Sequence, residues 1–329
     1  MIMAPCTHSD WIQVSRNQRE WQISNGSKLR RIVDNLEGKE YKHPLLVFFV
    51  GGKQKAEALG SLFLGKDHSG RRPTNIANLH IDSRTSDSEN PILFADADIE
   101  TSFDRNLKPL DTCHESNKTR LKWIAHKNVK EDSETIRDNL YSCLLFLFTD
   151  VLCLFAEDFE NDDVVSKLTC WWLLKPSQET IKPRVIIVIR DEVDENEAVK
   201  RFQVTPTISP KPRLVCLSKL KEALQQEMDA SREEKKKGRR LLSAVHLNDL
   251  FDKALSHITL TNTEPFSWIH ASRERNEVDN NFSDRLSPFL ELCFRLGTSD
   301  HFIIHFIASA IILDSYPPGM HRKCRSYQF

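Results

Sequence analysis

A run of apolar residues from Leu45 to Val50 leads directly into the pair Gly51-Gly52. A short, continuous apolar run that is bounded by glycine is typical of a strand buried in a sheet. We predict that a helix follows and extends to about Leu64. The sequence therefore predicts a strand, a glycine-containing connection and a helix, and the fold of the chain has to accommodate this unit.

This unit has the position of a phosphate-binding P-loop but lacks most of its residues. A P-loop reads G-x-x-x-x-G-K-[ST] between a strand and a helix; its backbone N–H groups and lysine hold phosphates, and its hydroxyl holds Mg²⁺. In an alignment that starts at Gly51, the second glycine falls on Ala56, the lysine on Glu57 and the hydroxyl on Ala58. We expect the carboxylate of Glu57 to lie where a γ-phosphate would bind and to repel it.

Further short apolar runs alternate with segments of helical spacing. Such alternation favours an α/β fold, a three-layer, doubly wound and mostly parallel sheet of P-loop NTPase type, here with a C-terminal helical extension. The polar stretch 99–130 has no clear period and predicts a surface insertion. The predicted strands are 45–50, 78–82, 91–96, 151–156, 184–189 and 214–217, and the predicted helices are 28–37, 134–148, 164–174, 219–258 and 283–314.

Composition excludes several classes of protein. The chain has 329 residues, 40 % of them hydrophobic, which suffices for one large α/β domain with a helical extension or for two small domains. A net charge of −1 provides no field that would steer it to nucleic acid or an anionic membrane. No apolar run reaches the ~20 residues of a membrane span, and the N-terminus has the features of neither a signal nor a transit peptide. Eight cysteines without metal-ligand spacing indicate a reducing compartment, so we expect a cytoplasmic location and no metal site.

An ordered series of segments resembles one known family. Phe48-Phe49-Val50-Gly51, Pro73-Thr74 and the runs 91–96 and 148–153 are similar to the P-loop GTPase-like region at the N-terminus of large fungal patatin-like phospholipases, and 183–188 and 314–321 extend the resemblance. It covers about residues 11–321. From the order of the predicted strands and helices we expect an N-terminal extension (1–27), a degenerate P-loop GTPase-like domain (28–218) and a helical extension (219–329).

The resemblance also implies which residues belong to a nucleotide site. The family's P-loop glycine, switch threonine and Asp-x-x-Gly aspartate match Gly51, Thr74 and Asp96, whereas Ile99 replaces the glycine of the last motif. The family's lipase domain uses a serine in G-x-S-x-G. This chain contains no such motif, so we do not carry the phospholipase activity over to it.

What remains is a vestigial phosphate and Mg²⁺ site without catalytic residues. Lys53 or Lys55 reaching into the loop would replace the missing cation and restore binding of GTP or ATP with Mg²⁺; otherwise we expect no cofactor. A threonine and an aspartate alone are a poor Mg²⁺ site, because the ion usually relies on substrate phosphates. The guanine-specificity motif N-K-x-D is absent after the strand 184–189. The expected site consists of Gly51, Gly52, Lys53, Lys55, Thr74 and Asp96.

Three other features have structural interpretations. The acidic pair Glu157-Asp158 follows a strand, where carboxylates near helix N-termini are favourable. The basic cluster 235–240 is interpreted as a solvated linker rather than a nucleic-acid contact. His301 and His305 lie four residues apart on a predicted helix and lack a third ligand, so packing in a core or interface is preferred to metal binding.

The sequence therefore favours a degenerate GTPase-like module with a regulatory or protein-interaction role. Its partner would be another protein or a phospholipase domain that is fused to it or missing. The alternative is a weakly active, Mg²⁺-dependent nucleotide-binding P-loop NTPase that uses Lys53 or Lys55. A third possibility is a gene remnant without function.

Overall fold

The computed structural model of the chain describes residues 9–17, 20–63, 76–99, 116–124, 133–159, 164–174, 182–191, 202, 211–237, 241–273 and 282–315. The chain divides into two compact units, Met1–Pro265 and Phe266–Phe329. The expected boundaries at 27/28 and 218/219 therefore differ from the division that the structure itself makes.

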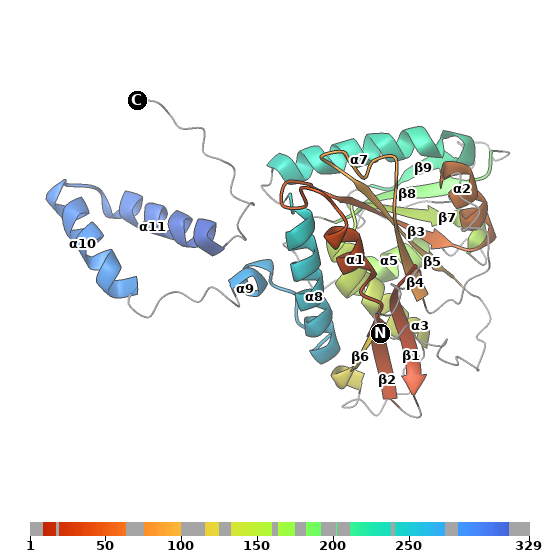
Figure 1. Ribbon diagram of the computed structural model, residues 1–329, viewed down its shortest axis with the longest axis horizontal. Helices are drawn as coiled ribbons and strands as arrows, with labels where there is room; N and C mark the ends of the chain where they lie inside the picture. The colour runs from red at the N-terminus through yellow and green to blue at the C-terminus, as the bar shows by residue number, and fades with distance from the viewer. Residues whose placement is uncertain are drawn as a thin grey trace, which may run out of the picture. The chain divides into compact units, whose positions relative to one another are not determined.

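The first unit is built around a nine-stranded sheet in the order β6-β2-β1-β4-β5-β3-β7-β8-β9 (Figure 1). The strands from β5 to β9 in this order run parallel, whereas β4, β1, β2 and β6 pair antiparallel. The α/β class is thus confirmed, but the sheet is mixed rather than mostly parallel. The strands are β1 (Asp10–Asn17), β2 (Glu20–Asn25), β3 (Leu45–Gly51), β4 (Ile76–Ile81), β5 (Ile92–Asp98), β6 (Asn117–Arg120), β7 (Val151–Phe155), β8 (Arg184–Ile189) and β9 (Arg213–Cys216).

The predicted helices form, with small shifts of their ends. The predicted helix 134–148 is one helical segment, in which the π-helical η3 (Tyr141–Leu145) joins α3 to α4. Two predicted helices are each divided in the structure: 219–258 consists of α7 and α8, and 283–314 consists of α10 (Phe282–Arg295) and α11 (Asp300–Ser315). The helices of the first unit are α1 (Lys28–Asp34), α2 (Lys53–Phe63), α3 (Ser133–Leu140), α4 (Phe146–Phe148), α5 (Val164–Leu174), α7 (Leu220–Lys237) and α8 (Ala244–Leu260).

Helices cover both faces of the parallel half of the sheet. Alternate residues of β3, such as Val47 and Phe49, pack with Leu59 of α2 and Leu224 of α7 in one apolar cluster. The intervening Phe48 faces the opposite side, where its ring lies 5.3 Å from Tyr141 and 6.5 Å from Phe146. All seven residues of β3 are buried, which explains why its sequence is continuously apolar rather than alternating.

Three strands of the sheet were not predicted. β1 and β2 form a hairpin within the segment 1–27, which is therefore in part an integral piece of the sheet rather than an extension. β6 lies within 99–130, and its pairing with β2 makes part of this predicted insertion the edge of the sheet. Its four residues are all exposed, so it has no apolar pattern, and backbone pairing alone defines it.

A buried carboxylate fastens α7 to the sheet. Asp150, 2 % exposed, accepts hydrogen bonds from the Leu46 N–H (2.9 Å) and the Ser231 hydroxyl (2.8 Å). The ammonium of Lys235 lies 2.8 Å from the same carboxylate. Lys235 is therefore a structural residue rather than part of a solvated linker, and residues 238–240 of the basic cluster lie outside the described residues.

Replacing Asp150 by alanine is expected to lower the free energy of unfolding by about 2–4 kcal/mol, because the change leaves a partly buried ammonium and a backbone N–H without their acceptor. Glu233→Gln is the matched control, because the Glu233 side chain is 54 % exposed and its ion-pair contact with Lys236 is long at 4.0 Å. Urea denaturation of both variants checks the expectation. Equal losses in the two would contradict it.

The second unit contains α9 (Trp268–Arg273), α10 (Phe282–Arg295) and α11 (Asp300–Ser315). The rings of Phe289 and Phe306 stack at 5.3 Å and join α10 to α11. The ring centroids of His301 and His305 lie 4.3 Å apart and both residues are exposed, so of the two expected environments the core is excluded and packing in an interface stays a prediction. Among the helices of the described residues, none combines the length and the apolar character that crossing a bilayer requires.

Candidate functional site

The connection between β3 and α2 is very short. β3 ends at Gly51 and α2 begins at Lys53, so only Gly52 separates them. The residues that the P-loop alignment placed in the loop are therefore already helical. Gln54 to Leu59 are mostly strong helix formers without glycine, which explains the early start of the helix.

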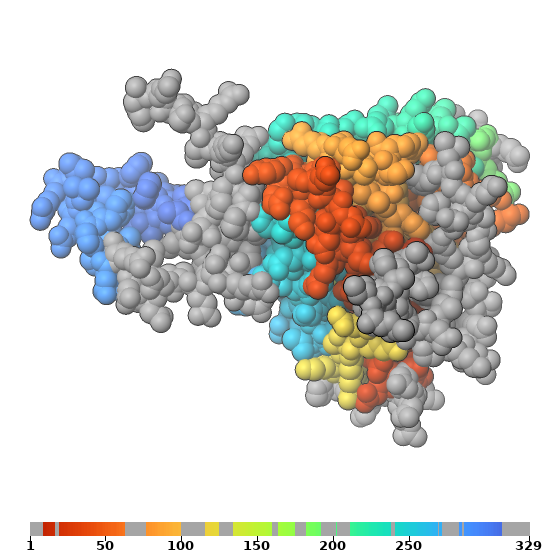
Figure 2. Space-filling view, in the orientation of Figure 1, coloured from red at the N-terminus to blue at the C-terminus, as the bar shows by residue number. Residues whose placement is uncertain are grey.

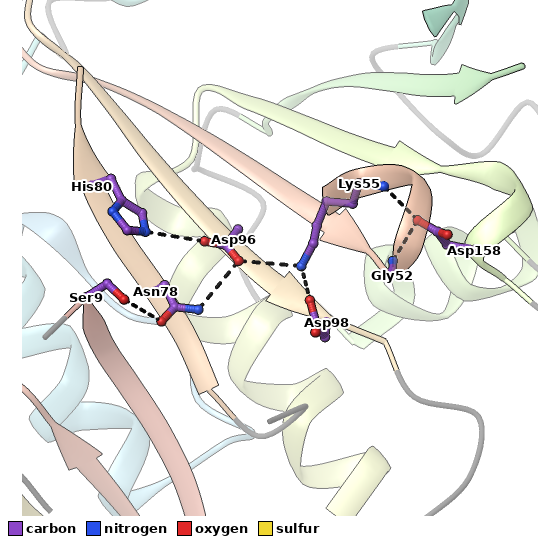
Figure 3. Close-up of polar contacts among 8 residues, drawn as sticks. All are labelled: Ser9, Gly52, Lys55, Asn78, His80, Asp96, Asp98 and Asp158. Carbon is purple, nitrogen blue, oxygen red and sulfur yellow. Dashed lines mark hydrogen bonds and ion pairs between the residues drawn. The ribbon is translucent and has the colours of Figure 1, made fainter. Parts of the chain in front are cut away.

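The backbone N–H groups at this connection converge on one carboxylate. Asp158 accepts hydrogen bonds from the N–H groups of Gly52 (2.6 Å), Gln54 (2.9 Å) and Lys55 (3.0 Å). Asp158 is the last residue of the 3-10 turn η4 (Ala156–Asp158), which follows β7, the neighbour of β3 in the sheet. Figure 3 shows the carboxylate beside Gly52 and the backbone of Lys55.

This arrangement is a helix N-terminus with its anion already in place. Free N–H groups and the helix dipole make such an end favourable for a carboxylate or a phosphate. Here the chain supplies the anion itself from about one hundred residues further along. Of the acidic pair after the strand 151–156, Asp158 thus has the structural role that the sequence favoured, with the helix N-terminus belonging to α2, whereas Glu157 accepts a hydrogen bond of 3.2 Å from the Arg190 N–H.

The side chain of Lys55 is buried, and its ammonium is paired with carboxylates. It is 1 % exposed, and its ammonium forms ion pairs with Asp98 and, at 3.5 Å, with Asp96. Figure 3 shows this side chain extending from α2 to β5, while its own N–H group faces Asp158. The cation expected to reach a phosphate is thus held by two carboxylates of the sheet.

Asp96 is the centre of a polar cluster rather than the end of a strand. β5 continues to Asp98, and Asp96 is 4 % exposed. Its carboxylate lies 3.5 Å from the amide nitrogen of Asn78 and 3.6 Å from Nε2 of His80, both on β4. Asn78 in turn accepts a hydrogen bond of 3.0 Å from Ser9 (Figure 3). Asp96 therefore joins β4, β5 and α2.

The remaining candidates lie elsewhere. The side chain of Lys53 is 90 % exposed, and its ammonium lies 3.9 Å from Glu57, one turn further along α2. The expectation that Glu57 occupies a phosphate position is therefore wrong, because its carboxylate is 60 % exposed on the second turn. Ala58 is fully buried in the core. Thr74 lies outside the described residues.

The structure thus brings together four of the six predicted residues, Gly51, Gly52, Lys55 and Asp96. It adds Asp158, Asp98, Asn78 and His80, which the sequence did not single out as site residues. Asp98 could have been found from the sequence, because it lies two residues after Asp96, and residues two apart on a strand point to the same face. In the part of the chain that the structure describes, no three His, Cys, Asp or Glu side chains are grouped to hold a metal ion.

Gly51 allows these groups to approach one another. A Cβ at this position would lie 2.7 Å from a carboxylate oxygen of Asp158 and 3.0 Å from the Cβ atoms of Lys55 and Phe155. Gly51→Ala is therefore expected to cost about 1–3 kcal/mol of stability through overpacking. Gly60, in the same helix, has open space around a Cβ, so Gly60→Ala should instead stabilise by about 0.5–1 kcal/mol. Chemical denaturation of both variants measures this difference, and a tolerated Gly51→Ala would contradict the packing described.

The carboxyl ends of β8 and β9 carry a separate contact. The carboxylate of Asp191, in the segment where N-K-x-D is absent, accepts hydrogen bonds from the N–H (2.9 Å) and the hydroxyl (2.7 Å) of Ser218. These two hydrogen bonds lower the pKa of Asp191.

No family model matches the sequence, and no curated protein matches it.

Proposed function

We propose that this chain is a degenerate GTPase-like module whose phosphate site is filled by its own side chain, and that it acts by binding a protein partner. The carboxylate of Asp158 on the three N–H groups at the start of α2 is the observation that carries this proposal. A module of this kind keeps a single state and presents a constant surface, which suits a regulatory or scaffolding role.

The position of the β3–α2 connection supports an origin in the P-loop NTPase type. β3 lies inside the parallel half of the sheet, with β5 on one side and β7 on the other. From β3 the chain continues to β4, beyond β5, whereas after β5 and the edge strand β6 it continues to β7 on the other side of β3, which makes this a topological switch point. In open α/β sheets, ligands bind at such a point, at the carboxyl ends of the strands. Gly51, Gly52 and Lys55 lie at this end, and Asp158 covers it from β7.

Charge explains why nucleotide binding would be lost. A phosphate would have to replace the carboxylate of Asp158, because two anions at this distance repel each other strongly in a partly dry site. The phosphate would also have to detach Lys55 from Asp96 and Asp98, with which its ammonium is paired. Each step removes interactions that already stabilise the fold. The P-loop alignment places neither lysine nor hydroxyl where they would compensate.

The resemblance to the N-terminal region of fungal patatin-like phospholipases suggests what the protein partner would be. In that arrangement the module would contact a phospholipase domain, fused to it or on a separate chain. Its role would be to position or restrain that domain rather than to hydrolyse a nucleotide. A protein partner of another kind is equally compatible with a closed site.

A weakly active nucleotide-binding P-loop NTPase is the second candidate. The convergence of three N–H groups on one anion favours it, since such a group of donors suits phosphate as well as carboxylate. In this case Asp158 would leave when the nucleotide enters, and Lys53 or Lys55 would supply the cation. The side chain of Lys53 is the more exposed of the two.

Titration of the purified chain with fluorescent GTP and ATP analogues, with and without Mg²⁺, separates the two candidates. We expect no binding up to millimolar nucleotide. Micromolar, Mg²⁺-dependent binding that is abolished by Lys53→Ala or Lys55→Ala would contradict the proposal and establish the alternative.

A further inference from the structure

A polar cavity of about 300 Å³ opens at the antiparallel side of the sheet, away from the β3–α2 connection. It lies where the end of β2, the start of α1, the edge strand β6 and the helix α8 meet (Figure 1). Figure 2 shows the surface of β6, in yellow, next to that of α8, in blue-green. The volume of this cavity is at the lower end of the range of small-molecule sites.

The lining of this cavity is rich in uncharged hydrogen-bonding groups. Amides and hydroxyls both donate and accept, so a ring of them can serve a ligand that does the same. The side chains of Asn117, Thr119 and Asn248 form no hydrogen bond within the part of the chain that the structure describes. The amide and hydroxyl side chains at the cavity include Asn25, Ser27, Asn117, Thr119, Asn248 and Ser256.

The loop that carries part of this lining has an unusual backbone. Ser27 has a φ of 52°, in the left-handed region that residues other than glycine rarely adopt. The side chain of Asn25 fixes it by accepting a hydrogen bond of 3.0 Å from the Ser27 N–H. At Gly26 a Cβ would lie 2.3 Å from the carbonyl oxygen of Asp10, so only glycine permits this close approach of the loop to β1. Backbone strain that the surroundings hold in place is often found at binding sites.

The charges at the cavity cancel. Arg30 and Asp252 form an ion pair of 2.7 Å, and among the described residues that line the cavity they are the only charged ones. An anion or a cation would have to compete with this pair and would gain no net attraction. Leu29, Phe251 and Leu255 add apolar surface to the lining. The lining thus matches a neutral ligand with hydroxyls on its rim and C–H groups on its faces.

We infer that this cavity binds a neutral polyol of the size of a monosaccharide or a cyclitol. Asn248 on α8 and Thr119 on β6 donate to and accept from its hydroxyl groups. The ion pair of Arg30 and Asp252 contacts further hydroxyls at the rim. The inference is independent of the proposed function, because the cavity shares no residue with the β3–α2 connection.

Isothermal titration calorimetry of the full chain with myo-inositol and D-glucose tests the inference. At least one of these probes is expected to bind saturably with a Kd in the millimolar range. Asn248→Leu and Thr119→Val should each weaken binding about tenfold, which corresponds to the loss of one good hydrogen bond. Gln225→Leu, a matched change at an exposed position of α7, should leave the Kd unchanged.

Three results would overturn the inference. The first is the absence of binding by both polyols in a chain whose circular dichroism shows that it is folded. The second is binding that neither Asn248→Leu nor Thr119→Val affects. Inorganic phosphate and glycine, titrated in parallel, are expected not to bind at this cavity; phosphate or glycine binding that Asn248→Leu removes would show a charged ligand instead and would also reject the polyol.

Discussion

Lys55→Met is expected to lower the free energy of unfolding by about 3–5 kcal/mol, the cost of breaking a buried ion pair by removing one partner. The ammonium of Lys55 is the cation shared by Asp96 and Asp98, and the lysine is 1 % exposed. Without it two carboxylates lie close together in the interior with no cation from α2. Methionine keeps most of the volume, so lost packing contributes little.

Lys53→Met is the matched control in the same helix. Its side chain is 90 % exposed and contacts Glu57 at 3.9 Å, so the loss should stay below about 0.5 kcal/mol. Adding Asp98→Asn to Lys55→Met should recover part of the stability, because it removes one of the two carboxylates that lose the Lys55 ammonium. Urea denaturation of the three variants measures their free energies of unfolding. A Lys55→Met variant as stable as Lys53→Met would show that the ion pairs of Lys55 do not hold α2 to β5.

Asp158→Ala is expected to destabilise the fold by about 2–3 kcal/mol, since three backbone N–H groups lose a charged acceptor at a helix N-terminus. Asp158→Asn should cost less, because its amide oxygen still accepts hydrogen bonds although the charge is gone. Glu157→Ala, the neighbouring acidic residue in the same turn, serves as the control. Thermal unfolding followed by circular dichroism compares the three. Equal losses for Asp158→Ala and Glu157→Ala would exclude the special role of Asp158.

The parallel half of the fold could be predicted because its strands are buried on both faces. β3, β7 and β8 are continuous apolar runs, and each was located to within about one residue. The antiparallel half lacks this signal. β1 carries the buried polar residues Gln13 and Ser15, and β6 is exposed throughout, so neither has a pattern that a single sequence reveals.

The candidate site could be predicted only in part, because its contacts join residues far apart in the chain. Gly51 and Lys55 were singled out from one local motif. The pairing of Asp158 with Gly52 spans 106 positions, and no local pattern specifies it. The P-loop alignment misplaced Glu57 for a different reason. It assumed a loop of P-loop length, whereas the helix-forming residues after Gly52 extend α2 toward the sheet.

If Asp158 occupies an anion site at the start of α2, inorganic phosphate should take its place when its carboxylate is removed, and the melting temperature in phosphate measures this. Wild-type chain and Asp158→Ala are heated with increasing inorganic phosphate, against sodium chloride of equal ionic strength. Phosphate is expected to raise the melting temperature of Asp158→Ala, by replacing the lost carboxylate on the N–H groups of Gly52, Gln54 and Lys55, and to leave that of the wild type unchanged. The same phosphate dependence in both proteins would contradict it.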